Sequence, residues 1–290
     1  MIRPKGPAHT APAPARIWVL LASEASTAVI FRRGPSRWTH LSLWNTRTDE
    51  ITQGSWFHGR LYEWMSDLSP DGQHLLYVAR NEAKRRVQAA AETFDGEHMW
   101  SWTALCRPPR VKALGLWNAS DGWSGGGVFT ANQALTLNHS ARDLKALIQP
   151  NGFTAQGVTD RERVDTVLLA LKRTGWQVTA WPEQWMGMGE AYPVVLRKRA
   201  LELRFISSPQ YRRYVTYTWH GPDPVPLLEG ASWADFDQQG RLVIAQEGRL
   251  YAMWGTEARE LIDLNVHQPP RHSSAASSDV ATPIIQANRS

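Results

Sequence analysis

Residues 64–77 read WMSDLSPDGQHLLY, and residues 233–244 read WADFDQQGRLVI. Each stretch begins with a tryptophan, has an aspartate two or three positions later, and reaches a glycine before a second apolar run. Because aspartate and glycine favour a tight reversal between apolar runs, both stretches predict a β-hairpin. Residues 123–137 form a weaker third copy. Such a repeat is typical of a β-propeller, whose blades each place their first strand at the central axis.

The fixed offset of Trp64 and Trp233 from the turn glycine indicates that these two side chains pack within blades. Short apolar runs separated by turns cover most of the remaining chain. Two groups of four runs are each the size of one blade, and they comprise residues 17–22, 28–32, 40–44 and 50–56, and residues 231–236, 241–245, 249–254 and 260–265. We therefore expect a mainly-β, propeller-like fold with about five blades, four to six being compatible with the pattern.

The middle of the chain interrupts this rhythm with patterns of helical period. Residues 140–150 combine a possible Ser140 cap with apolar residues three and four apart, and Pro150 would end that helix. Residues 164–175 carry a stronger apolar stripe that ends at a glycine. We therefore predict a helical insertion near 140–175. Residues 81–92 predict a short surface helix or an ordered loop.

The ends of the chain differ from its centre in composition. Residues 1–15 and 268–290 are rich in Pro, Ala and Ser, so we expect a disordered leader and a disordered tail around one domain at 16–267. No run reaches the roughly 18 apolar residues of a membrane span, and the run at 17–23 is too short for a signal peptide. The sequence therefore predicts a cytoplasmic protein without a membrane partner.

Composition limits the possible partners and cofactors. The 290 residues include 15 Trp, and the net charge is +5 with a pI of about 9.5. The basic residues occur in small groups, as expected for solvated strand edges and turns, so we do not expect nucleic acid as the partner. The single Cys106 excludes an intrachain disulfide and a cysteine-rich zinc site, and we expect it to be buried. Nothing in the sequence predicts a cofactor.

Two levels of resemblance support the fold. The phrase LSPDG at 68–72, followed by Leu75 and Tyr77, is similar to the blades of TolB-like and WD40-like propellers. Four longer phrases together resemble a bacterial family of uncharacterised, propeller-like proteins. They are FRRGPS at 31–36, GSWFHGRLYE at 54–63, GGGVF at 125–129 and EGASWAD at 229–235.

This resemblance implies a bacterial, intracellular protein. It implies no catalytic residues, because no activity is assigned to that family. The chain departs from the family's pattern in one place, where residues 81–95 form a longer insertion than we expect.

Candidate site residues come from positions rather than from a complete motif. The chain has no G-x-S-x-G, no H-x-H and no H-E-x-x-H. The best candidates for metal ligands are Asp67, His139 and Asp235, because they end the expected inner strands, whose ends can converge at a propeller axis. The candidate binding residues are Arg33, Arg60 and Trp123.

We therefore expect a non-enzymatic interaction or scaffold module that binds another protein. Two alternatives stay open. One is a hydrolase or lyase with its site on the propeller axis, and the other is a lectin-like carbohydrate binder that uses exposed tryptophans. Converging acids and histidines at the axis would favour an enzyme, whereas an axis filled by Trp and Leu would favour the interaction module.

Overall fold

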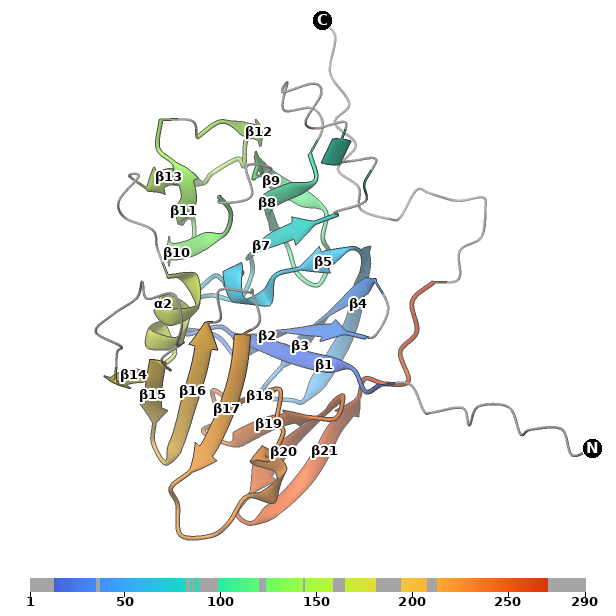
Figure 1. Cartoon of the computed structure of the whole chain (residues 1–290), viewed down its shortest axis with the longest axis vertical. Helices are drawn as coiled ribbons and strands as arrows, with labels where there is room; N and C mark the ends of the chain where they lie inside the picture. Colours follow the sequence, from blue (N-terminus) through green and yellow to red (C-terminus); the bar gives the residue numbers. More distant parts are fainter. Residues whose placement is uncertain are drawn as a thin grey trace, which may run out of the picture.

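The structure is a five-bladed β-propeller, built from five small sheets in a ring (Figure 1). It is a computed structural model that describes residues 13–34, 37–81, 84, 87–88, 99–119, 124–142, 144–158, 165–180, 194–207 and 213–270. The mainly-β fold and the expected number of blades are confirmed. Most of the expected leader and tail lies outside the described residues.

The first and last blades are antiparallel sheets of four consecutive strands. The first contains β1 (Arg16–Leu21), β2 (Thr27–Arg33), β3 (Trp38–Asn45) and β4 (Glu50–His58). The last contains β18 (Trp233–Phe236), β19 (Leu242–Gln246), β20 (Arg249–Trp254) and β21 (Glu257–Asp263). In both, the first strand is almost wholly buried and the fourth is the most exposed. This burial gradient fits β1 and β18 as inner strands and explains why their sequences are nearly continuous apolar runs.

The second and third blades interleave. The second contains β5 (Arg60–Leu61), β6 (Asp67–Leu68), β7 (Leu75–Arg80), β8 (Ser101–Cys106), β9 (Ala113–Asn118) and β12 (Ala146–Ile148). The third contains β10 (Gly127–Ala131), β11 (Ala134–Ser140) and β13 (Thr154–Val158). The chain thus returns from β11 to pair β12 with β9, and then adds β13 parallel to β11.

The helix predicted at residues 140–150 is therefore wrong. Ala146 pairs with Trp117 and Ile148 pairs with Leu116 in the second blade. The apolar spacing of this segment suits a helix locally, but pairing with the edge of an existing sheet determines its conformation. Tertiary context overrides local propensity here.

The second expected helix is confirmed as α2 (Thr166–Arg173). Asp165 caps it, since its carboxylate accepts a hydrogen bond from the Leu168 amide at 3.1 Å. The fourth blade follows, with β14 (Gln177–Ala180), β15 (Val194–Lys198), β16 (Leu201–Ser207) and β17 (Arg213–Trp219). Within the segment 81–92, Lys84, Val87 and Gln88 are helical, and most other residues lie outside the described ones.

The two predicted turns owe their shape to glycine. Gly72 has φ +72° and Gly240 has φ +78°, which is the left-handed region that side chains disfavour. In the first turn the Asp71 carboxylate accepts hydrogen bonds from the Ser69 hydroxyl at 2.6 Å and the Gln73 amide at 3.0 Å. Both predicted hairpins are thus confirmed.

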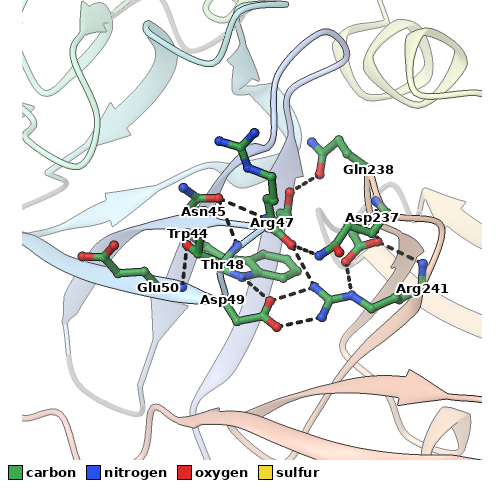
Figure 2. Close-up of polar contacts among 11 residues, drawn as sticks. Trp44, Asn45, Arg47, Thr48, Asp49, Glu50, Asp237, Gln238 and Arg241 are labelled. Carbon is green, nitrogen blue, oxygen red and sulfur yellow. Dashed lines mark hydrogen bonds and ion pairs between the residues drawn. The ribbon is translucent and has the colours of Figure 1, made fainter.

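Side-chain contacts close the ring between the first and last blades (Figure 2). The Arg241 guanidinium donates to both oxygens of Asp49 at 2.7 Å and to Asp237 at 2.7 Å. It also donates to the Thr46 carbonyl at 2.9 Å, and Gln238 donates to the Ala22 carbonyl at 2.7 Å. The first blade is formed by β1–β4 and the last blade by β18–β21, which are far apart in the chain. These polar contacts between the two blades therefore close the ring.

The core runs through the inner strands of the ring. Cys106 is fully buried, as predicted, and burial raises the pKa of its thiol. Trp233 is also buried, as expected for a blade-packing residue. Among the described residues, the helices are too short or too polar to cross a membrane.

Candidate functional site

The two ends of the propeller axis are built differently. The strands β1 and β18 begin beside a large pocket, which we call the open pocket. A much smaller space, which we call the axial cavity, lies further along β1, and its lining shares Trp18 and Glu63 with the open pocket. The open pocket is lined by Arg16, Ile17 and Trp18 at the start of β1 and by residues 230–232 ahead of β18.

At the axial cavity, α2 packs against β6, β10 and the 3-10 helix η1 (Glu63–Met65). The cavity left between these elements and the inner strands has a volume of about 30 Å³. Such a space holds about two water molecules and is too small for a substrate. Its wall is mostly apolar and includes Leu20, Leu21, Val167, Leu171 and Trp233.

Asp67, one of the predicted metal candidates, lines this cavity as half of a buried ion pair. Its side chain is 1% exposed, and both carboxylate oxygens accept hydrogen bonds from the Arg173 guanidinium of α2. The amides of Leu68 and Phe129 donate to it at 3.0 and 2.8 Å. Burial raises the pKa of this carboxyl, and the facing guanidinium opposes that rise. The interaction ties α2 to the second and third blades.

Asp235 occupies the corresponding place in the last blade. The Lys198 ammonium donates to it at 2.6 Å, the Trp176 indole N–H at 2.9 Å, and the Phe236 amide at 2.6 Å. Burial again raises the pKa of the carboxyl, opposed by the ammonium of Lys198. The two copies of the sequence repeat therefore place their aspartates in equivalent positions. Asp67 pairs with Arg173, just before the fourth blade, and Asp235 pairs with Lys198 in the fourth blade.

The third metal candidate lies elsewhere. His139 does not line the axial cavity, and its Nε2 lies 2.9 Å from the Thr103 hydroxyl. Asp67 and Asp235 thus share one cavity wall, whereas His139 is separate from them. Within the part of the chain that the structure describes, no group of three or more His, Cys, Asp or Glu residues is placed to hold a metal ion. The metal role of these three residues stays a prediction.

The open pocket has a volume of about 340 Å³, which is within the usual range for ligand sites. It lies where residues of the first, second, fourth and last blades meet. Its polar lining consists of Arg16, Arg33, Thr39, Glu63, Ser232 and Glu247. Its apolar lining includes Ile17, Trp18, Phe31, Trp64 and Val215. The pocket therefore offers charged groups of both signs beside an aromatic wall.

Two tryptophans form this wall. The rings of Trp18 and Trp64 lie 4.1 Å apart, and Trp64 also lies 6.0 Å from Phe205. Trp18 is 6% exposed, and its buried indole N–H has no hydrogen-bond partner among the described residues. An unpaired buried donor is rare in proteins. The sequence predicts that Trp64 packs within a blade, whereas its ring contacts Trp18 of the first blade and Phe205 of the fourth, and it also lines the pocket. Sequence reasoning missed Trp18 because it belongs to no repeat.

The predicted binding residues divide between the pocket and its surroundings. Arg33 lines the open pocket, with its Nη1 at 3.7 Å from a carboxylate oxygen of Glu63. Arg60 lies outside the lining, with its guanidinium 4.4 Å from the centre of the Tyr62 ring. Trp123 lies outside the described residues.

Charges of both signs act on Arg33 at its side of the pocket. Burial lowers the pKa of Arg33, Glu63 raises it, and the charges of Arg60 and Arg16 lower it further. The positive charges of Arg16 and Arg60 thus act on Arg33, which lies beside the Glu63 carboxylate. This side of the pocket is suited to an anionic group.

The chain matches no protein-family model and no curated protein sequence. It is similar to a solved structure from a structural and mechanistic analysis of two prolyl endopeptidases, at 9% identity and a TM-score of 0.21. The similarity covers 82% of this chain, which spans about a third of the length of that structure (33%).

Proposed function

We propose that this protein is a non-enzymatic binding module that holds a segment of another protein in the open pocket. The observation that supports this most is the difference between the ends of the axis. Two of the candidate metal ligands, Asp67 and Asp235, are engaged in ion pairs beside a cavity of about 30 Å³. The open pocket is about ten times larger and contains charged and aromatic groups together.

The aromatic wall favours a peptide over a sugar. A sugar-stacking tryptophan needs a free ring face, whereas Trp64 lies between Trp18 and Phe205. The wall therefore offers apolar surface, which suits an amino-acid side chain. The bacterial origin and the cytoplasmic location that the sequence implies belong to the same proposal.

Site-specific photocrosslinking in the organism that encodes the chain tests the proposal. A photoreactive phenylalanine analogue replaces Arg16 or Glu247, which are exposed at the pocket. Matched control variants carry it at Leu114 or Arg259, which are exposed and do not line the pocket. We expect a discrete protein adduct from the two pocket positions only. Adducts from the control positions alone, or no protein adduct at any position, would contradict the proposal.

A further inference from the structure

The charge around the open pocket is unevenly distributed. Arg16 and Arg33 line it on one side, with Arg60 close enough for its charge to act on Arg33. Glu63 is the neighbouring acid on that side, and its carboxylate is 3.7 Å from Arg33, beyond hydrogen-bond distance. Arg33 thus keeps donors available for a second, better placed acceptor. A carboxylate can accept two parallel hydrogen bonds from one guanidinium, which makes it a suitable partner.

Apolar surface lies beside these arginines. Phe31 comes from the same strand as Arg33, two residues earlier, so both side chains project from one face of β2. Val215 and Trp64 complete this part of the lining. A ligand that places a carboxylate at Arg33 therefore meets apolar groups within the reach of a neighbouring side chain.

The pocket also carries Glu247 and adjoins a second depression of about 580 Å³, whose lining includes Arg32 and Arg249. The two depressions share Pro14, Ala15 and Glu247 in their linings. A ligand with uniform negative charge, such as a nucleic-acid strand, would bring phosphates against Glu247 and Glu63. A peptide with spaced carboxylates avoids this repulsion, because it can present neutral residues there.

We infer that the open pocket recognises an acidic peptide segment of a partner protein, with a carboxylate at Arg33 and Arg16 and an adjacent apolar side chain against Phe31 and Trp64. This inference rests on the proposed function, since it names the class of partner for the same pocket. Alternating acidic and apolar residues are the chemistry that the lining complements.

Fluorescence anisotropy with purified full-length chain tests this inference. The probe is a fluorescein-labelled hexapeptide that alternates glutamate and leucine, and the matched probe alternates glutamine and leucine. We expect the glutamate probe to bind at least tenfold more tightly, because hydrogen bonds to charged groups are stronger than those between neutral groups. Equal binding of the two probes would overturn the acidic class. So would displacement of the glutamate probe by a single-stranded DNA hexamer at concentrations equal to the unlabelled peptide, which would indicate a nucleic-acid site instead.

Variants locate the binding. Arg33→Gln should weaken the glutamate probe by tenfold or more, whereas Arg259→Gln, which removes an exposed arginine paired with Glu257, should change its affinity less than twofold. Arg16→Gln, at an exposed position, is a second pocket variant if Arg33→Gln disturbs folding. Equal effects of the pocket and control variants would overturn the inference.

The outcomes separate the inference from the proposed function. Protein adducts at the pocket positions, together with equal binding of the glutamate and glutamine probes, would leave the pocket a protein-binding site and overturn only the acidic class. Absence of adducts, with binding of the glutamate probe that Arg33→Gln abolishes, would support the anion chemistry and overturn the protein partner.

Discussion

The two ends of the propeller axis contain similar residue types and use them in opposite ways. At the axial cavity, Asp67 and Asp235 are each paired with a cation and hold blades together. At the open pocket, Arg33 lies 3.7 Å from its nearest carboxylate and borders a space of about 340 Å³. Charged groups at the first end therefore contribute to stability, and those at the second remain available to a ligand. The difference can be tested by substituting one group at each end.

The largest loss of stability is expected for Asp67→Ala. It leaves the Arg173 guanidinium without its carboxylate and the amides of Leu68 and Phe129 without their acceptor. Removing one partner of a buried pair costs about 3–5 kcal/mol, so we expect a loss of this size in the free energy of unfolding, measured by urea denaturation.

The control for this variant removes both charges. Asp67→Leu combined with Arg173→Met leaves no unpaired ion, so we expect the double variant to recover most of the loss. If Asp67→Ala changes stability by less than 1 kcal/mol, Asp67 does not hold the blades together, and its candidacy as a functional residue returns.

A pH titration sharpens the comparison by probing His40, which lines neither the open pocket nor the axial cavity. His40 is buried, its ring lies 4.5 Å from that of Trp56, and burial and the charge of His267 lower its pKa from 6.5 to about 4. Because the unfolded chain binds the proton first, stability is fully present above pH 6.5 and falls as the pH decreases toward 4, by about 3 kcal/mol in all.

Chemical denaturation at several pH values checks this expectation. In the His40→Gln variant, the free energy of unfolding should decrease between pH 6.5 and 4 by about 3 kcal/mol less than in the wild type. An unchanged pH profile in the variant would show that the imidazole is not held neutral by its surroundings.

Asp235→Ala should be less harmful than Asp67→Ala. It removes the partner of Lys198 and the acceptor of the Trp176 N–H, so we expect a loss of about 2–3 kcal/mol in the free energy of unfolding. The loss is smaller because a lysine stem is flexible and can carry its ammonium to water, whereas Arg173 is held by two backbone carbonyls. A larger loss than for Asp67→Ala would reverse this ranking of the two pairs.

The smallest change in stability is expected for Arg33→Gln. Arg33 and Glu63 are 27% and 20% exposed, and pairs of this kind contribute about 0–1 kcal/mol. We expect the free energy of unfolding to change by less than about 0.5 kcal/mol, as thermal and urea denaturation would show. A loss comparable with that of Asp235→Ala would assign Arg33 a structural role and remove the contrast between the two ends.

The sequence predicts the fold where neighbours in the chain are also neighbours in space. The first and last blades follow from consecutive apolar runs, and the hairpins at Gly72 in the second blade and at Gly240 in the last follow from their turn residues. The interleaving of the second and third blades could not be predicted, because β12 pairs with a strand that precedes it by two intervening strands. The apolar spacing around β12 also fits a helix, so only pairing with the edge strand β9 determines that this segment is a strand.

The residues of the candidate site could likewise be predicted only where their role does not depend on partners that are distant in the chain. Arg33 was predicted as a binding residue, and it lines the pocket. Trp18 was missed because it lies within an apolar run where nothing distinguishes it from packing residues. The role of Asp67 depends on Arg173, which is 106 positions away in the chain, so no local pattern reveals that the carboxylate is paired.

The most direct test measures unfolding and binding together in one variant from each end. We predict that Arg33→Gln keeps the wild-type free energy of unfolding and loses at least tenfold in affinity for the glutamate–leucine hexapeptide. We predict that the double variant Asp67→Leu, Arg173→Met, once folded, binds this peptide with wild-type affinity. Loss of binding in the folded double variant, with full binding retained in Arg33→Gln, would contradict the assignment of function to the open pocket.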